Sequence, residues 1–183
     1  LFRSTTGTQA WPVGVGHHSN YHDKFNENVR IVSNVFDGMT YVGVRPFKYN
    51  DVVIEDNDFI NCQQGVRISA ANGNGMYDFG LPQAGKNVII HNNRFKNIAT
   101  QHILAAGWEK DGNVAKIENI IISDNVFKQD ISGADDCIEL SFVHNVFIGK
   151  KNFFKNVQRG VYIRYGSSVD VVGNNFENIA YEP

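Results

Sequence analysis

The densest group of ionisable side chains is the acidic run SGADDCIEL at 132–140, which contains Asp135, Asp136 and Glu139. Carboxyl groups that crowd together take different pKa values, because ionising one disfavours ionisation of its neighbour. One group can then serve as the acid and another as the base of a hydrolytic reaction. These three residues are the candidate catalytic carboxylates. The alternative is that they are ordinary solvated side chains of a turn.

Arginines offer a second chemistry, the removal of a proton next to a sugar carboxylate with stabilisation of the resulting anion. Arg67 and Arg159 are candidate bases for such an elimination, as is Lys110. Arg45 and Arg67 both follow a Gly-Val pair, and two arginines held side by side would favour an anionic ligand between them. The alternative is an ion pair with a loop carboxylate such as Asp78.

Aromatic side chains in two long connections could stack on sugar rings. The connection at 70–86 contains Tyr77 and the connection at 106–118 contains Trp108, so both are candidate substrate-binding residues. Such connections carry function in repeat proteins. The alternative is that the aromatic rings only anchor their own loops to the core.

Metal chemistry is not expected. His17, His18, His22 and Asp23 offer nitrogen and oxygen ligands, but neighbouring histidines on an extended chain point in opposite directions. The two cysteines, Cys62 and Cys137, have no metal or redox spacing and are expected to be small buried hydrophobic residues. We therefore predict no metal site and no cofactor.

A nine-residue repeat indicates which elements must position these groups. The pattern Asn/Asp-Val/Ile-x-Ile/Val-x-x-Asn-x-Phe, with one variant that has an extra residue, starts at positions 28, 51, 87, 119, 145 and 168. A repeat of about 23 residues with two or three short strands is typical of one turn of a solenoid. The composition agrees, since 20 Val and 17 Ile against 4 Leu favour strands, and 22 Asn and 17 Gly favour turns.

A second short strand follows each copy of the repeat. Aligning these strands predicts an outward column of side chains about 4.8 Å apart, formed by Arg45, Arg67, Ile103, Glu139 and Tyr162. Tyr162 is therefore a candidate substrate-binding residue. His102 of the preceding coil and Arg159 of the following coil are expected beside the acidic run, and His102 is a further binding candidate.

Stacked turns would place Asn34, Asn57, Asn93, Asn125, Asn152 and Asn174 in a ladder, and the Phe two residues after each of them in a stack. This pattern resembles the right-handed parallel β-helix superfamily of pectate lyases, polygalacturonases and phage tailspikes. The resemblance covers residues 28–179. It implies an all-β, right-handed parallel β-helix (solenoid) of about six to seven coils in a single domain, 1–183, with 1–27 as a partial coil and loop. We expect the chain to be a fragment of a longer helix.

The acidic run resembles the Gly-Asp-Asp-Cys motif of polygalacturonases, in which the aspartates are catalytic. The match is partial, because the family has Asn-Thr-Asp on the preceding coil, where this chain has Thr100-Gln101-His102. It has Gly-His-Gly on the following coil, where this chain has Arg159-Gly160-Val161. The resemblance to lyases allows Ca²⁺ at an acid-rich loop, although the chain has no EF-hand loop.

Length and charge exclude several classes of protein. The 183 residues can form one domain without a stabilising metal or disulfide. A net charge of −2 argues against a broad nucleic-acid-binding surface, and no apolar run is long enough to span a membrane. We expect no nucleic-acid partner and no membrane partner, and a location that is extracellular or on a virion surface.

The leading hypothesis is a module that binds and degrades an acidic or cell-surface polysaccharide, as a glycoside hydrolase or a polysaccharide lyase. Resemblance to tailspikes would make it part of a phage tailspike or secreted depolymerase, and in a tailspike a homotrimer is expected. The alternative is a non-catalytic glycan-binding or structural segment of a phage appendage or adhesin. A sugar epimerase on the same fold is a third hypothesis.

Overall fold

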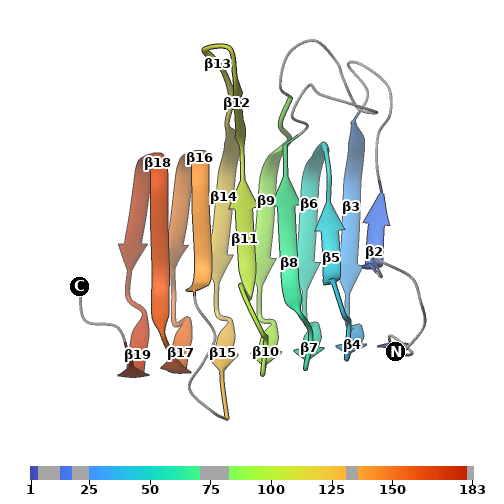
Figure 1. Cartoon of the computed structure of the whole chain (residues 1–183), viewed down its shortest axis with the longest axis vertical. Helices are drawn as coiled ribbons and strands as arrows, with labels where there is room; N and C mark the ends of the chain where they lie inside the picture. Colours follow the sequence, from blue (N-terminus) through green and yellow to red (C-terminus); the bar gives the residue numbers. More distant parts are fainter. Residues whose placement is uncertain (4–12, 18–24, 71–82, 131–135, 181–183) are drawn as a thin grey trace.

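The computed structural model describes residues 1–3, 13–17, 25–70, 83–130 and 136–180. These residues form β-strands, turns and connections and no helix. Within those ranges, no helix therefore has the length and apolar character needed to cross a bilayer. Every strand pair in the two large sheets is parallel, and the chain returns to the same wall after each turn (Figure 1).

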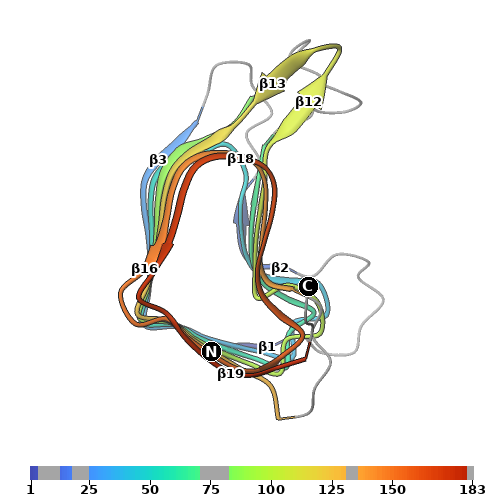
Figure 2. The ribbon, with the colours of Figure 1, turned by 90° about the vertical axis from the view of Figure 1, so that its left-hand side faces the viewer.

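Figure 2 shows the winding end-on, with three walls around a common core. One wall is a seven-stranded sheet of short strands. Its order is β1 (Phe2–Arg3), β4 (Val35–Asp37), β7 (Asp58–Ile60), β10 (Arg94–Lys96), β15 (Val126–Lys128), β17 (Phe153–Val157) and β19 (Asn175–Ile179).

The other two walls belong to a single sheet that bends round a corner. One wall contains β2 (Val13–His17), β5 (Val42–Pro46), β8 (Gln64–Ser69) and β11 (Ile103–Ala106). The other contains β3 (Asn26–Val32), β6 (Tyr49–Glu55), β9 (Lys86–His91) and β14 (Ile117–Ser123). The strands β16 (Asp136–Gly149) and β18 (Arg159–Val172) pass through the corner and contribute to both walls.

The nine-residue repeat is confirmed in register. Its second residues align across neighbouring strands, as the pairs Val29–Val52, Val52–Val88, Ile120–Val88, Ile120–Val146 and Val146–Val169 show. All six first residues have a positive φ of 54–59°, a conformation in which Asn and Asp are tolerated better than most other residues. The abundance of Asn therefore has a backbone cause. The handedness expected from the resemblance stays a prediction.

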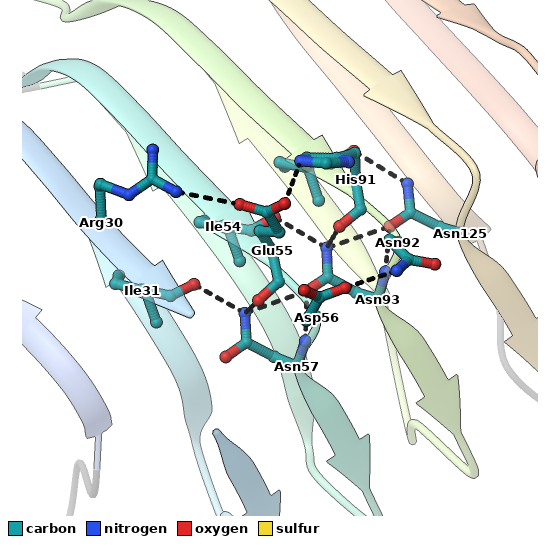
Figure 3. Close-up of polar contacts among 11 residues, drawn as sticks. Arg30, Ile31, Ile54, Glu55, Asp56, Asn57, His91, Asn92, Asn93 and Asn125 are labelled. Atoms are coloured by element: carbon teal, nitrogen blue, oxygen red, sulfur yellow. Dashed lines mark hydrogen bonds and ion pairs between the residues drawn. The ribbon is translucent and has the colours of Figure 1, made fainter. Parts of the chain in front are cut away.

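The predicted asparagine ladder is present (Figure 3). Asn93 is fully buried, and its backbone N–H donates to Oδ1 of Asn125 at 2.9 Å. Its side-chain amide donates to the carbonyl oxygens of Ile54 and His91, each at 2.9 Å. Asn57 in turn donates to Oδ1 of Asn93. Each ladder residue thus satisfies backbone groups that the turn would otherwise leave unpaired inside the core.

The phenylalanine stack is also present and fills one side of the core. Neighbouring ring centroids are 4.7–5.1 Å apart, in the order Phe2, Phe36, Phe59, Phe95, Phe127, Phe154 and Phe176. Glycines lie over these rings, since a Cβ on Gly43 or Gly65 would come 2.7 Å from a ring carbon of Phe59 or Phe95. His102 and Cys137 occupy the same register position in the next two strands. Both cysteines are buried and unpaired, as expected.

Candidate functional site

Arginine and tyrosine side chains lie on the outer surface of β5, β8 and β18. We call this surface the Tyr–Arg face and define it by Tyr41, Arg45, Arg67, Arg159, Tyr162 and Arg164. The strand register places Arg45 beside Arg67, because Val44 pairs with Val66. It also places Glu139 beside Tyr162. Side chains of neighbouring strands are therefore about 4.8 Å apart along this face.

At one end of the face, a tyrosine lies against two arginines. The guanidinium carbon of Arg45 is 5.7 Å from the centroid of the Tyr41 ring, and that of Arg67 is 5.9 Å from it. Arg67 Nη1 also donates to the Tyr41 hydroxyl at 3.0 Å. The expected adjacency of the two arginines is present, with an aromatic ring against both of them. Cation–π contacts of this kind stabilise the two like charges and fix their positions.

The other end repeats this arrangement. The guanidinium carbons of Arg159 and Arg164 lie 4.3 Å and 4.8 Å from the centroid of the Tyr162 ring. A polar row joins the two ends, in which Gln64 donates to Gln101 at 2.6 Å and Gln101 donates to Glu139 at 3.0 Å. The face carries four arginines, and among the described residues the carboxylates of Asp136 and Glu139 contact it.

The candidate catalytic acids do not form a free pair of carboxylates. Asp136 is 3% exposed and accepts hydrogen bonds from Arg159 through both of its oxygens, from Nε and, at 3.0 Å, from Nη2. Glu139 accepts a hydrogen bond from Gln101, and its other oxygen lies 4.0 Å from Arg164 Nη2. Asp135 lies outside the described residues. The bidentate pair also engages Arg159, one of the three candidate bases.

The structure corrects the expected position of His102. This residue is fully buried, and its ring packs edge-on against Phe95 and Phe127, with centroids 6.1 Å and 5.6 Å apart. It cannot contact a ligand on the outer surface. Burial lowers the pKa of the imidazole to about 3. Gly43 and Gly65 occupy this register position in earlier strands, so nothing in the repeat predicts an imidazole beside the Phe stack.

The outward column also needs one correction. Leu104, and not Ile103, pairs with Arg67 and Glu139. Ile103 is fully buried because it aligns with the inward Val66. The alignment slipped by one residue where the Gly-Val marker of the other strands is missing.

The predicted loop aromatics fall in different places. Trp108 is 43% exposed and starts a hairpin of β12 (Trp108–Lys110) and β13 (Asn113–Ala115), which projects beyond the walls in Figure 2. Tyr77 and Asp78 lie outside the described residues. So do His18, His22 and Asp23, while His17 ends β2. Among the described residues, no three His, Cys, Asp or Glu side chains gather as metal ligands.

Sequence reasoning missed Tyr41, Gln101 and Arg164. Arg164 could have been found from strand alternation, because it lies two residues after Tyr162 on the same strand. Tyr41 lies just before its strand, and no equivalent tyrosine precedes the matching Arg67. Its contacts with Arg45 and Arg67 form only when β5 and β8 pair in the folded chain.

Comparisons with known proteins place the chain near a bacterial adhesin. The chain is 27% identical over 176 residues to the plasmin and fibronectin-binding protein A of Streptococcus pneumoniae (strain ATCC BAA-255 / R6), covering 90% of the chain and 24% of that protein. The chain therefore spans about a quarter of the length of this curated relative. No protein-family model matches the chain.

A solved structure shares the fold. It is the crystal structure of PfbA, described as a surface adhesin of Streptococcus pneumoniae, with a TM-score of 0.53 and 21% sequence identity. The match covers 92% of the present chain and 40% of the PfbA chain. At this level of identity the likeness concerns the fold, and it agrees with an all-β, parallel, solenoid-like architecture.

Proposed function

We propose that the chain is a non-catalytic, adhesive module of a surface protein and that it binds a protein ligand through the Tyr–Arg face. The observation that carries the proposal is the preorganised pair of Tyr–Arg clusters, with Tyr41 against Arg45 and Arg67 and Tyr162 against Arg159 and Arg164. Tyrosine and arginine dominate the binding energy of protein interfaces, and side chains held in place lose little entropy on binding. The ligand surface is expected to be acidic.

Similarity to a plasmin and fibronectin-binding protein supports a protein ligand over a polysaccharide, and an extracellular position on a bacterial surface over a virion. We propose plasmin and fibronectin as the first ligands to test. The pectate-lyase-like resemblance supports a right-handed winding of the solenoid, but the binding proposal does not depend on that handedness.

Degradation of a polysaccharide receives less support than adhesion. Hydrolysis requires one carboxyl to donate a proton and another to accept one. Asp136, the best buried of the candidates, is bound to Arg159 through both oxygens, which is the geometry of a structural ion pair. Both oxygens of this carboxylate are engaged by Arg159, so neither is free to contact a substrate.

The test measures binding of the 183-residue chain to immobilised plasmin and fibronectin by biolayer interferometry. The double variant Arg45→Gln/Arg67→Gln is expected to weaken binding by about tenfold or more, as is usual for interface residues of this kind. The matched control is Arg3→Gln/Arg94→Gln, which removes two ion-paired arginines from the seven-stranded sheet. Its affinity should equal that of the unmodified chain.

Two results would contradict the proposal. Equal losses of affinity in the two double variants would mean that the arginines contribute only through the overall positive charge of the chain. Cleavage of an acidic polysaccharide by the unmodified chain, lost in Asp136→Asn, would restore the enzymatic hypothesis. Unsaturated sugar products would then indicate a lyase and saturated products a hydrolase.

A further inference from the structure

A second surface, far from the Tyr–Arg face in the winding, has an ordered pattern that the proposed function does not use. It is the outer face of β3, β6, β9 and β14 with the second halves of β16 and β18. The strand register stacks one outward residue from each strand in a column, which we call the outer stripe. Its members in order are Arg30, Val53, Ile89, Ile121, Phe147 and Asp170.

The middle of the outer stripe is apolar and accessible. Ile89 is 37% exposed and Ile121 is 42% exposed. The floor of a shallow groove of about 390 Å³ includes Val53, Ile89 and Ile121. Polar residues would occupy these outward positions without any structural penalty, so a row of branched apolar side chains here needs a reason.

The two halves of the outer stripe differ in shape: the half that contains Phe147 carries a large ring, and the half that contains Val53 lies in the groove. The Phe147 ring lies over Gly149, since a Cβ placed on that glycine would come 2.5 Å from a ring carbon. The Phe147 ring therefore lies along its own strand, β16, which is two strands beyond the strand of Ile89 in the stacking order. The groove lies over the earlier strands, where the smaller Val53 occupies the equivalent position.

A ladder of exposed polar side chains flanks the groove. Asn87 donates to Asp51, Asn119 donates to Asn87 and Asn145 donates to Asn119, each at 2.8 Å. In this ladder each asparagine amide has a second N–H that the ladder does not use. The groove is thus apolar on its floor and hydrogen-bonding along one side.

We propose that this face binds a second copy of the same chain, with the two solenoid axes antiparallel. A two-fold axis along the strand direction, between β9 and β14, reverses the order of the outer stripe. Arg30 then faces Asp170 of the second copy, Val53 faces Phe147 and Ile89 faces Ile121. The large ring of one copy meets the hollow half of the other, and opposite charges meet at both ends.

The neighbouring columns are complementary under the same rotation. Lys86 and Glu118 lie on adjacent strands of one column, so Lys86 of each copy faces Glu118 of the other. In the polar ladder, Asp51 faces Asn145 and Asn87 faces Asn119, so hydrogen-bonding groups meet each other. A self-complementary patch of this kind is what a two-fold interface requires.

Charge complementarity favours a second copy over other occupants of the groove. The stripe ends in a cation on one side and an anion on the other, so its best partner has the same pattern in reverse. Arg30 contacts Glu55 at 3.1 Å, and Glu55 also contacts His91 at 3.1 Å (Figure 3). Asp170 has no ion pair within the described part of the chain, and it would gain one in the dimer.

The area of the face that contains the outer stripe determines the expected affinity of dimerisation. The five spacings of about 4.8 Å between the six strands and about seven residues at about 3.3 Å give an area of roughly 550 Å² on each copy. The total of about 1,100 Å² is at the low end for specific interfaces, so we expect association in the micromolar range.

The experiment is sedimentation equilibrium of the 183-residue chain between about 1 µM and about 200 µM, a range that brackets such an affinity. The chain is expected to pass from monomer to dimer. Ile89→Lys should weaken dimerisation by at least about tenfold, because it places a cation opposite Ile121. The matched control Val126→Lys changes an equally exposed residue on the seven-stranded sheet and should leave the dimer unchanged.

A charge reversal then tests the antiparallel arrangement. Arg30→Asp and Asp170→Arg should each weaken the dimer, and the double variant should recover most of the affinity. Circular dichroism of each variant checks that it is folded. A wild-type chain that stays monomeric over the whole range would overturn the proposal. So would equal effects of Ile89→Lys and Val126→Lys, or a double reversal that stays as weak as the single ones.

Discussion

His102 is the residue whose environment departs most from what its type requires. Neither ring nitrogen has a hydrogen-bond partner within the described structure, and aromatic rings pack against both sides of its position. An unpaired buried polar group costs about 1–3 kcal/mol. The imidazole is tolerated only because it stays uncharged, and burial lowers its pKa to about 3 from an ordinary value of 6.5.

This burial predicts a pH dependence of stability. Below pH 6.5 the unfolded chain binds a proton at His102 that the folded chain does not bind until about pH 3. The stability of the folded state is therefore complete above pH 6.5 and falls as the pH decreases towards 3. The slope approaches about 1.4 kcal/mol per pH unit in the middle of that window.

Urea unfolding of His102→Leu at several pH values checks this prediction. At neutral pH the variant should be as stable as the unmodified chain or more stable, because the unpaired nitrogens are gone. Its advantage should grow by about 1–2 kcal/mol between about pH 6 and about pH 4.5. His144→Gln, on the outer face of the sheet, is the control for losing a histidine outside the core. A difference in the free energy of unfolding between His102→Leu and the unmodified chain that stays the same at every pH would mean that the imidazole is accessible to protons in the folded state.

At the scale of the strand and the turn, one residue in each repeat satisfies the backbone and another fills the core. The Asn ladder completes the hydrogen bonds of the turns, and the Phe stack fills the adjacent space. Both run the length of the solenoid, so a residue in the middle has a neighbour on each side and a terminal residue has only one. Phe95 is 1% exposed between two rings, whereas Phe176 is 50% exposed with one.

The position in the stack therefore predicts the cost of removing a ring. Phe95→Ala should lower the free energy of unfolding by about 3–5 kcal/mol, through lost burial and the cavity left behind. Phe176→Ala should cost less than about half as much, since half of its surface already faces solvent. Chemical denaturation of the two variants provides the comparison. Equal losses of unfolding free energy in the two variants would show that each ring contributes to stability independently of its neighbours in the stack.

The elements could be predicted from the sequence far better than the site. Asn57, Asn93 and the Phe residues that follow them recur at fixed positions in the repeat, and stacking turns requires such residues to align. The outward residues do not recur, so nothing in the pattern tests their alignment. That is why the column slipped at Leu104. Tyr41 was missed because it precedes its strand and its contacts, with Arg45 and Arg67, involve two neighbouring strands.

At the scale of the whole molecule, the two proposals assign different functions to two different faces of the solenoid. The Tyr–Arg face lies on β5, β8 and β18, and the outer stripe lies on the wall that begins with β3 (Figures 1 and 2). A dimer through the outer stripe leaves both Tyr–Arg faces outside the contact. Each dimer would then present two ligand-binding faces.

Two binding faces predict a dependence on ligand density. On a densely coated surface the dimer should dissociate at least about tenfold more slowly than the Ile89→Lys variant, because a second face holds the particle while the first releases. On a sparsely coated surface the two rates should agree. Dissociation rates measured at two coating densities provide the check. A difference that persists on the sparse surface would mean that Ile89 itself contacts the ligand.

The parallel stacking of the strands also determines how the molecule would respond to a pulling force. Hydrogen bonds between neighbouring turns run along the solenoid axis, so a load applied to the chain ends would detach the terminal turn before any inner turn. The last two repeats start at Asn145 and Ser168, so each released turn has about 23 residues. Such a turn would lengthen the chain by about 75 Å when extended. Under flow, a surface protein built in this way would give way in steps and dissipate energy as a series of small ruptures, while the inner turns kept their shape.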